Sequence, residues 1–258
     1  MATAKLITKK DKTKTSKTKS KKTKSLLPRD IKKIREYDRE LFRALFICGH
    51  VSEKNLLKLM ADKYGTDRTN RIETWLKNGF IQNHSKSKNK GSRVFALTSL
   101  GVKLCKKEEG LKFKGSHQSH DSGKIRHNLG LSHKYMQLSQ AQRESCRTET
   151  TIREEDFKGL IRSLTKEILI KDQELSSLQK GTDEYKQKED ELYTIKLRLD
   201  GIECAWESRD ISTPDLSYVD ETGQEVYYEI VTNYTAKEIA AKVEFSKLMN
   251  KDILMQRV

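Results

Sequence analysis

Apolar residues in the first part of the chain recur at the spacing of α-helices and then at the spacing of β-strands. This pattern predicts helices over residues 28–48, 52–65 and 67–79, strands over 80–84 and 93–98, and a helix over 99–107. Between the two strands, residues 85–92 read SKSKNKGS, a polar loop that joins them as a hairpin.

Three helices followed by a hairpin with a basic tip is the order of a winged helix-turn-helix, which we expect over residues 28–106. A helix in the major groove needs short polar side chains and Arg to reach base edges. A basic loop can contact phosphates or the minor groove. The candidate DNA-binding residues are Arg68, Thr69, Asn70, Arg71, Lys86, Lys88, Lys90 and Arg93. A winged helix that binds protein remains the alternative.

The rest of the chain predicts a linker over residues 107–123 and a second domain over 124–258. For that domain the pattern predicts helices over 124–143 and 235–250, a helical hairpin over about 158–199, and strands over 201–208, 213–220, 225–232 and 252–258. A further short strand is expected within 145–157. We therefore expect an α+β fold with a mixed sheet.

The helical hairpin shows heptad-like apolar spacing that Lys171 interrupts. Its two helices are expected to pack on each other through their apolar faces. The hairpin is either a purely structural feature or an arm for a homodimer or another partner protein.

Charge points to a polyanionic partner. The chain holds 52 Lys and Arg against 37 Asp and Glu, a formal net charge of +15. Residues 1–27 contribute much of this as a Lys-rich tail, which we expect to be disordered. It either strengthens DNA binding in a salt-sensitive way or is a solvated tail without a specific role. No segment predicts a membrane span or a secretory signal, so we expect a cytoplasmic protein associated with the nucleoid.

Metal-site signals outside the strands are weak. The four cysteines are far apart and form no CxxC pair. His117, His120 and Asp121 could be imagined as ligands, but loop histidines without an organised set of further ligands are usually only solvated.

Two carboxylates in the last strands raise the question of catalysis. Asp215 opens one strand and Glu229 lies in the next strand of a hairpin. Metal-dependent nucleases place carboxylates this way to hold Mg²⁺ against a phosphate, with a lysine nearby. Val231 stands where that lysine is usual, so Lys237 or Lys242 on the following helix would have to reach back. Alternatively, Glu229 forms an ion pair with Arg126, His127 or Lys242 and has a structural role.

These motifs, in this order, resemble the plasmid replication-relaxation family, and the last part resembles the PD-(D/E)XK nuclease-like fold. The similarity rests on the segment Arg126-His127-Asn128-Leu129, on Pro214-Asp215, and on Glu229, Val231, Thr232 and Lys242. The resemblance implies a winged helix followed by a nuclease-like domain, in a DNA-binding protein of a plasmid, conjugative element or phage. It implies a role in replication, mobilisation or transcriptional control.

Two functions follow from these observations. The first is a DNA-binding protein without catalysis and with no certain cofactor. The alternative is a Mg²⁺-dependent DNA endonuclease, in which Asp215 and Glu229 bind the metal while Lys242 and His127 complete the catalytic set.

Overall fold

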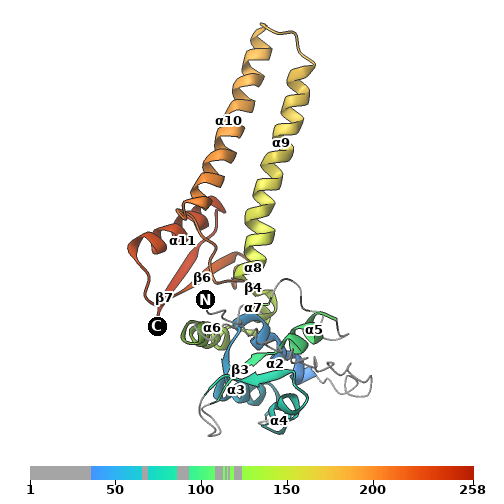
Figure 1. Cartoon of the computed structure of the whole chain (residues 1–258), viewed down its shortest axis with the longest axis vertical. Helices are drawn as coiled ribbons and strands as arrows, with labels where there is room; N and C mark the ends of the chain where they lie inside the picture. The colour runs from blue at the N-terminus through green and yellow to red at the C-terminus, as the bar shows by residue number, and fades with distance from the viewer. Residues whose placement is uncertain are drawn as a thin grey trace, which may run out of the picture. The chain divides into compact units, whose positions relative to one another are not determined.

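The structure is a computed structural model that describes residues 36–65, 69–85, 93–107, 113, 115, 117, 118 and 124–258. These residues belong to one compact unit with an α+β fold, as predicted (Figure 1). Within them, no helix is long and apolar enough to span a membrane. The Lys-rich tail of residues 1–27 lies outside the described residues.

The first part of the unit combines short helices with a small antiparallel sheet. Its elements are α2 (Glu36–Cys48), β1 (Val51–Ser52), α3 (Glu53–Tyr64), α4 (Thr69–Lys77), β2 (Ile81–Asn83), β3 (Val94–Leu97) and α5 (Ser99–Lys107). The strand order is β1-β3-β2, with both pairs antiparallel. The predicted hairpin is therefore confirmed, while β1 was missed because two residues give no periodicity.

Local chemistry explains where these elements begin and how they pack. The hydroxyl of Ser52 accepts a hydrogen bond from the backbone amide of Asn55 at 3.2 Å and caps the start of α3. Gly65 ends that helix in the left-handed region, with φ of 70°. The rings of Phe42, Trp75 and Phe80 meet edge to face in the core.

The second part is built on a four-stranded mixed sheet. Its strands are β4 (Arg147–Thr148), β5 (Leu216–Val219), β6 (Glu225–Val231) and β7 (Ile253–Arg257). They are ordered β4-β5-β6-β7; β5 pairs antiparallel with β4 and β6, and β7 runs parallel to β6. The mixed sheet and its final short strand confirm the prediction.

The second part also contains helices. They are α6 (Ile125–Gln137), α7 (Gln140–Ser145), α8 (Glu149–Ile152), a π-helical turn η2 (Arg153–Phe157), α9 (Lys158–Ser176), α10 (Asp183–Glu207) and α11 (Ala236–Leu248). The predicted strand over 201–208 is wrong, because α10 continues to Glu207. There Ile202 is buried in the core and Trp206 stacks on Phe157, so helical packing overrides the β-like composition.

Contacts join the two predicted domains. Helix α6 follows the predicted linker, yet Asn55 Nδ2 on α3 donates to Ser132 Oγ on α6 at 3.0 Å. The Asn128 amide on α6 meets His50 Nδ1 at 2.9 Å. Of the linker itself few residues are described, and Phe113 is buried against Phe46.

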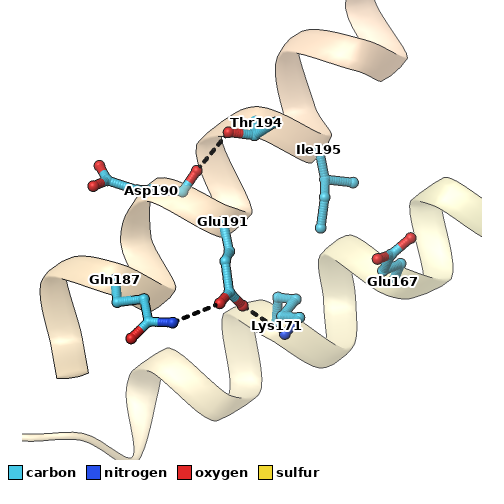
Figure 2. A pocket seen from close by; sticks show the side chains of 7 residues that line it. All are labelled: Glu167, Lys171, Gln187, Asp190, Glu191, Thr194 and Ile195. Atoms are coloured by element: carbon cyan, nitrogen blue, oxygen red, sulfur yellow. Dashed lines mark hydrogen bonds and ion pairs between the residues drawn. The ribbon is translucent and has the colours of Figure 1, made fainter.

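Helices α9 and α10 lie side by side and run in opposite directions as a long hairpin, here called the arm (residues 158–207; Figure 1). The predicted helical hairpin is confirmed, and it is longer than expected at its second helix. Lys171, which interrupts the apolar spacing, forms an ion pair with Glu191 across the arm at 2.8 Å (Figure 2). Lys188 pairs with Glu174 at 3.1 Å, so the polar positions of the seam form a layer of crossed ion pairs.

Candidate functional site

The four residues predicted as a possible catalytic set lie together at one end of the sheet. Asp215 immediately precedes β5, one position beyond the Leu216–Tyr228 pair and therefore opposite Glu229 on β6. Lys242 approaches from α11 and His127 from the first turn of α6. Directly opposite residues of an antiparallel pair lie side by side, which brings the two carboxylates close together.

Helix α6 can reach this point because of a glycine. A Cβ atom at Gly130 would lie 3.1 Å from Cγ2 of Ile230 on β6, tighter than an ordinary contact. Glycine at this position therefore lets α6 approach the sheet closely. His127, one turn earlier on the same helix, is held within reach of Asp215.

Glu229 is fully buried, with 0 % of its surface exposed, and protein groups contact both of its carboxylate oxygens. Oε1 is 2.9 Å from Lys242 Nζ and accepts a hydrogen bond of 2.7 Å from the Tyr234 hydroxyl. Oε2 accepts from the Asp215 backbone amide at 2.9 Å. Lys242 also donates to the Thr213 carbonyl at 2.6 Å, so its ammonium is shared between a carboxylate and the chain just before β5.

Asp215 is held from the other side. Its Oδ2 is 2.8 Å from His127 Nε2 and accepts the backbone amide of Ile230 at 2.9 Å. His127 Nδ1 in turn lies 3.2 Å from the side-chain oxygen of Asn128. We call Asp215, Glu229, Lys242 and His127 the buried cluster.

Burial and charge shift the titration of these groups in different directions. Burial and the charge of Asp215 raise the pKa of Glu229 to about 7. Burial opposes ionisation of Asp215 as well, but the hydrogen bond from His127 and the charges of His127 and Lys242 lower its pKa below the usual range. Burial alone would lower the pKa of His127 and of Lys242. The neighbouring carboxylates outweigh burial, so the pKa of each group is raised.

A cavity of about 560 Å³ lies beside the cluster, on the side of Lys242 and Tyr234. Its other charged lining residues are Glu149, Arg153, Arg209 and Glu238. Arg209 has a backbone φ of 61°, a region that non-glycine residues seldom adopt. Arg153 belongs to the π-helical turn.

The geometry does not suit a bound divalent metal. Mg²⁺ needs several oxygen ligands with free lone pairs in near-octahedral geometry. Here Lys242, Tyr234 and a backbone amide already occupy the oxygens of Glu229. In the part of the chain that the structure describes, no group of three or more His, Cys, Asp and Glu side chains is placed to hold a metal ion. For the weaker metal candidate, His117 lies against the Phe46 ring, while His120 and Asp121 lie outside the described residues.

The structure places only some of the candidate DNA-binding residues. Asn70 is exposed in the first turn of α4. Arg68, Lys86, Lys88 and Lys90 lie outside the described residues, as does the side chain of Thr69.

Two of the predicted DNA-binding arginines face carboxylates inside the fold instead. Arg71 forms an ion pair with the buried carboxylate of Asp38 and covers the Trp75 ring at 5.1 Å. Arg93 forms ion pairs with the buried carboxylate of Glu53 and, at 2.7 Å, with Glu73. A charge engaged in this way already has its counterion, which makes it less available to a phosphate.

Sequence reasoning missed Tyr234 and Thr213, which complete the cluster, and Glu149 beside it. Tyr234 lies between β6 and α11, where no motif marks it.

The chain matches no known protein family, and neither the curated proteins nor the solved structures include one that is significantly similar to it.

Proposed function

We propose that this protein binds DNA through the part formed by α2 to β3 and that the buried cluster supports the fold without cutting DNA. The observation that carries the proposal is the element order. Helices α2, α3 and α4 precede the β2–β3 hairpin, and β1 completes a sheet ordered β1-β3-β2. This arrangement supports a winged helix-turn-helix, with α4 as the helix that enters the major groove.

Charge supports a nucleic acid as the partner. The chain has a formal net charge of +15, and the hairpin loop contributes Lys86, Lys88 and Lys90 within five residues. The start of α4 adds the exposed Asn70, a residue type that can hydrogen-bond to adenine. Lysines in the loop would contact phosphate, while α4 would read the sequence.

The contacts of the buried cluster support a structural role for it. Its carboxylates already bind an ammonium, an imidazole, a phenol and two backbone amides. A catalytic metal would have to displace several of these contacts, and each displaced group would remain buried without its partner. We propose that the second part is a nuclease-like domain whose site serves the stability of the fold.

A DNA-binding measurement at several salt concentrations tests the proposal. Fluorescence anisotropy with a labelled duplex should show binding that weakens as salt increases. Changing Lys86, Lys88 and Lys90 to Ala should lower the slope of log affinity against log salt by about 2 to 3, since each phosphate contact contributes about 0.9. The control changes Lys180, Lys186 and Lys247, three exposed lysines far from the loop in sequence, to Ala. An equal loss in both variants would contradict a DNA-binding wing.

The endonuclease alternative is tested separately. Supercoiled plasmid is incubated with the protein and Mg²⁺ or Mn²⁺, beside Glu229→Gln, which preserves the size of the side chain. We expect intact plasmid in every reaction. Metal-dependent nicking that Glu229→Gln abolishes would overturn the non-catalytic proposal.

A further inference from the structure

The two sides of the arm differ in composition, because one carries ion pairs and the other carries exposed apolar side chains. On one side, Glu174 and Glu191 lie beside the seam. Glu191 forms an ion pair with Lys171 (Figure 2), and Glu174 forms one with Lys188. On the opposite side, three large apolar side chains are open to solvent. They are Leu169, Tyr193 and Leu197, which are 60 %, 62 % and 53 % exposed.

The register of the arm shows that these apolar residues lie close together. Ion pairs join Lys171 to Glu191 and Lys188 to Glu174 across the seam. Because the two helices are antiparallel, each step forward along α9 corresponds to one step backward along α10. Residue pairs whose numbers have the same sum as these ion pairs therefore lie level with each other. Leu169 is therefore level with Tyr193. Leu169 follows the seam residue Ile168, and Tyr193 follows the seam residue Leu192. Ile168 and Leu192 occupy the same heptad position, so Leu169 and Tyr193 lie on the same side of the antiparallel pair. Leu197 lies one helical turn from Tyr193. We call these three residues the apolar patch.

Charges of opposite sign flank the apolar patch. Toward the base of the arm, Lys166 and Lys196 lie level with each other. Toward the tip, Asp172 and Glu189 lie about one turn beyond the patch. All four side chains are exposed, and within the described residues no ion pair or side-chain hydrogen bond engages any of them.

We propose that this side of the arm binds the same side of a second copy of the chain, with the two arms antiparallel. A two-fold axis through the patch places Leu169 and Tyr193 of one copy on those of the other. The same axis brings the basic pair at the base of each arm onto the acidic pair at the tip of its partner. A surface that complements itself in this way is what an isologous dimer requires. Two paired hairpins form a four-helix bundle.

The size of the surface predicts a weak dimer. Helix α9 has 19 residues, so the paired face is about 28 Å long. Two helices, each roughly 10 Å across, give on the order of 1,100 Å² buried over both copies, at the lower end of specific interfaces. The monomer and the dimer should therefore exchange in the micromolar range.

The test is sedimentation velocity of the full chain, without DNA, from about 1 to about 100 µM, a range that spans micromolar dissociation constants. We expect the wild-type sedimentation coefficient to rise with concentration. Reversing the basic pair (Lys166→Glu with Lys196→Glu) should weaken self-association by at least about tenfold. Reversing the acidic pair (Asp172→Lys with Glu189→Lys) should do the same.

Mixing the two reversed proteins distinguishes this geometry from a general charge effect. Each reversed chain repels its own copy, but the two are complementary to each other, so an equimolar mixture should regain wild-type association. The control reverses Lys106 on α5 and Lys180 in the turn between α9 and α10, two exposed cations outside the patch, and changes the net charge equally. The proposal is overturned if the wild type stays monomeric throughout, if the control weakens association as strongly, or if the mixture does not associate.

Discussion

The molecule contains two clusters with the same kinds of charge in different surroundings. The buried cluster pairs Asp215 and Glu229 with Lys242 and His127. A second cluster, here called the clamp, pairs Asp156 and Glu225 with Arg147 and Lys251. The clamp joins β4, η2, β6 and the segment that leads into β7.

The carboxylates of the two clusters differ in how far solvent reaches them, and in the buried cluster those of Asp215 and Glu229 are only 5 % and 0 % exposed. The clamp side chains are between 12 % and 23 % exposed, and each carboxylate meets two cations. Burial acts against ionisation of Asp156, but hydrogen bonds from Arg147, Lys251 and Tyr227 lower its pKa to about 2. Glu229, with one cation and a second carboxylate nearby, has its pKa raised to about 7. The number of neighbouring cations and the access of water therefore decide whether a paired carboxylate is easily ionised.

The largest effect should come from removing the only lysine of the buried cluster. Lys242→Met leaves Glu229 buried without its cation, so at pH 8 the carboxyl must take up a proton or remain as an unpaired charge. We expect the free energy of unfolding to fall by about 3–5 kcal/mol, measured by urea denaturation. Adding Glu229→Gln to this variant should restore part of the loss, because no unpaired charge is then buried and the amide oxygen of Gln can still accept a hydrogen bond in place of the carboxylate. A single-variant loss below about 1 kcal/mol would contradict this account of the cluster.

The two clusters should also respond to different ranges of pH. The folded pKa of Glu229 is raised from an ordinary value near 4.5 to about 7, and that of His127 is raised above 6.5. Both groups therefore bind protons more tightly in the folded state, and their contribution to stability is lost as pH rises through these folded values. Asp156 and Glu225 have lowered pKa values, so their contribution is present above about pH 4 and is lost in acid.

We expect the free energy of unfolding to decrease by about 1–3 kcal/mol between pH 5 and pH 8. Glu229→Gln, which does not titrate, should flatten most of this slope, while Asp156→Asn should leave it unchanged. Urea denaturation at both pH values measures each slope. Stability that rises over the interval would show that ionised Glu229 is favoured in the folded state.

Breaking the clamp should have a smaller effect than breaking the buried cluster. Arg147→Met removes contacts to Asp156 and Glu225, but Lys251 still reaches both carboxylates, at 2.8 and 2.6 Å. Water can also solvate the remaining charges. We expect a loss of about 1–2 kcal/mol in the free energy of unfolding. A loss as large as that of Lys242→Met would mean that exposure does not separate the two clusters.

The sequence allowed the buried cluster to be predicted but not the clamp. Asp215 and Glu229 fall in two strands predicted to form a hairpin, His127 and Lys242 fall on predicted helices, and all four do lie together. Residues of the clamp are ordinary charged residues, and Arg147 lies 78 positions from Glu225, so only the folded chain brings them together.

Contacts between residues far apart in the chain also limited how much of the fold could be predicted. Helix and strand periodicity identified the β2–β3 hairpin, the arm and the mixed sheet. It failed over residues 201–208, where the segment that contains Trp206 packs as the end of α10. It also gave no sign that Arg71 and Arg93 are neutralised by Asp38 and Glu53, because those pairs depend on tertiary contacts.

The smallest effect on stability is expected for the ion-pair layer of the arm, because its charges are exposed to solvent. Lys171 contacts Glu191 at 2.8 Å (Figure 2) and Glu174 at 3.6 Å, and the side chains of both glutamates are more than a third exposed. Exposed pairs are screened by salt and gain little over hydrated ions. Glu191→Gln should therefore leave the urea midpoint within experimental error in high salt and lower it only slightly in low salt. Gln187→Ala, which removes only the neutral hydrogen-bond partner of Glu191, is the control and should show no salt dependence. If Glu191→Gln lowered stability as much as Arg147→Met at both salt concentrations, the strength of these clusters would not follow their exposure to water.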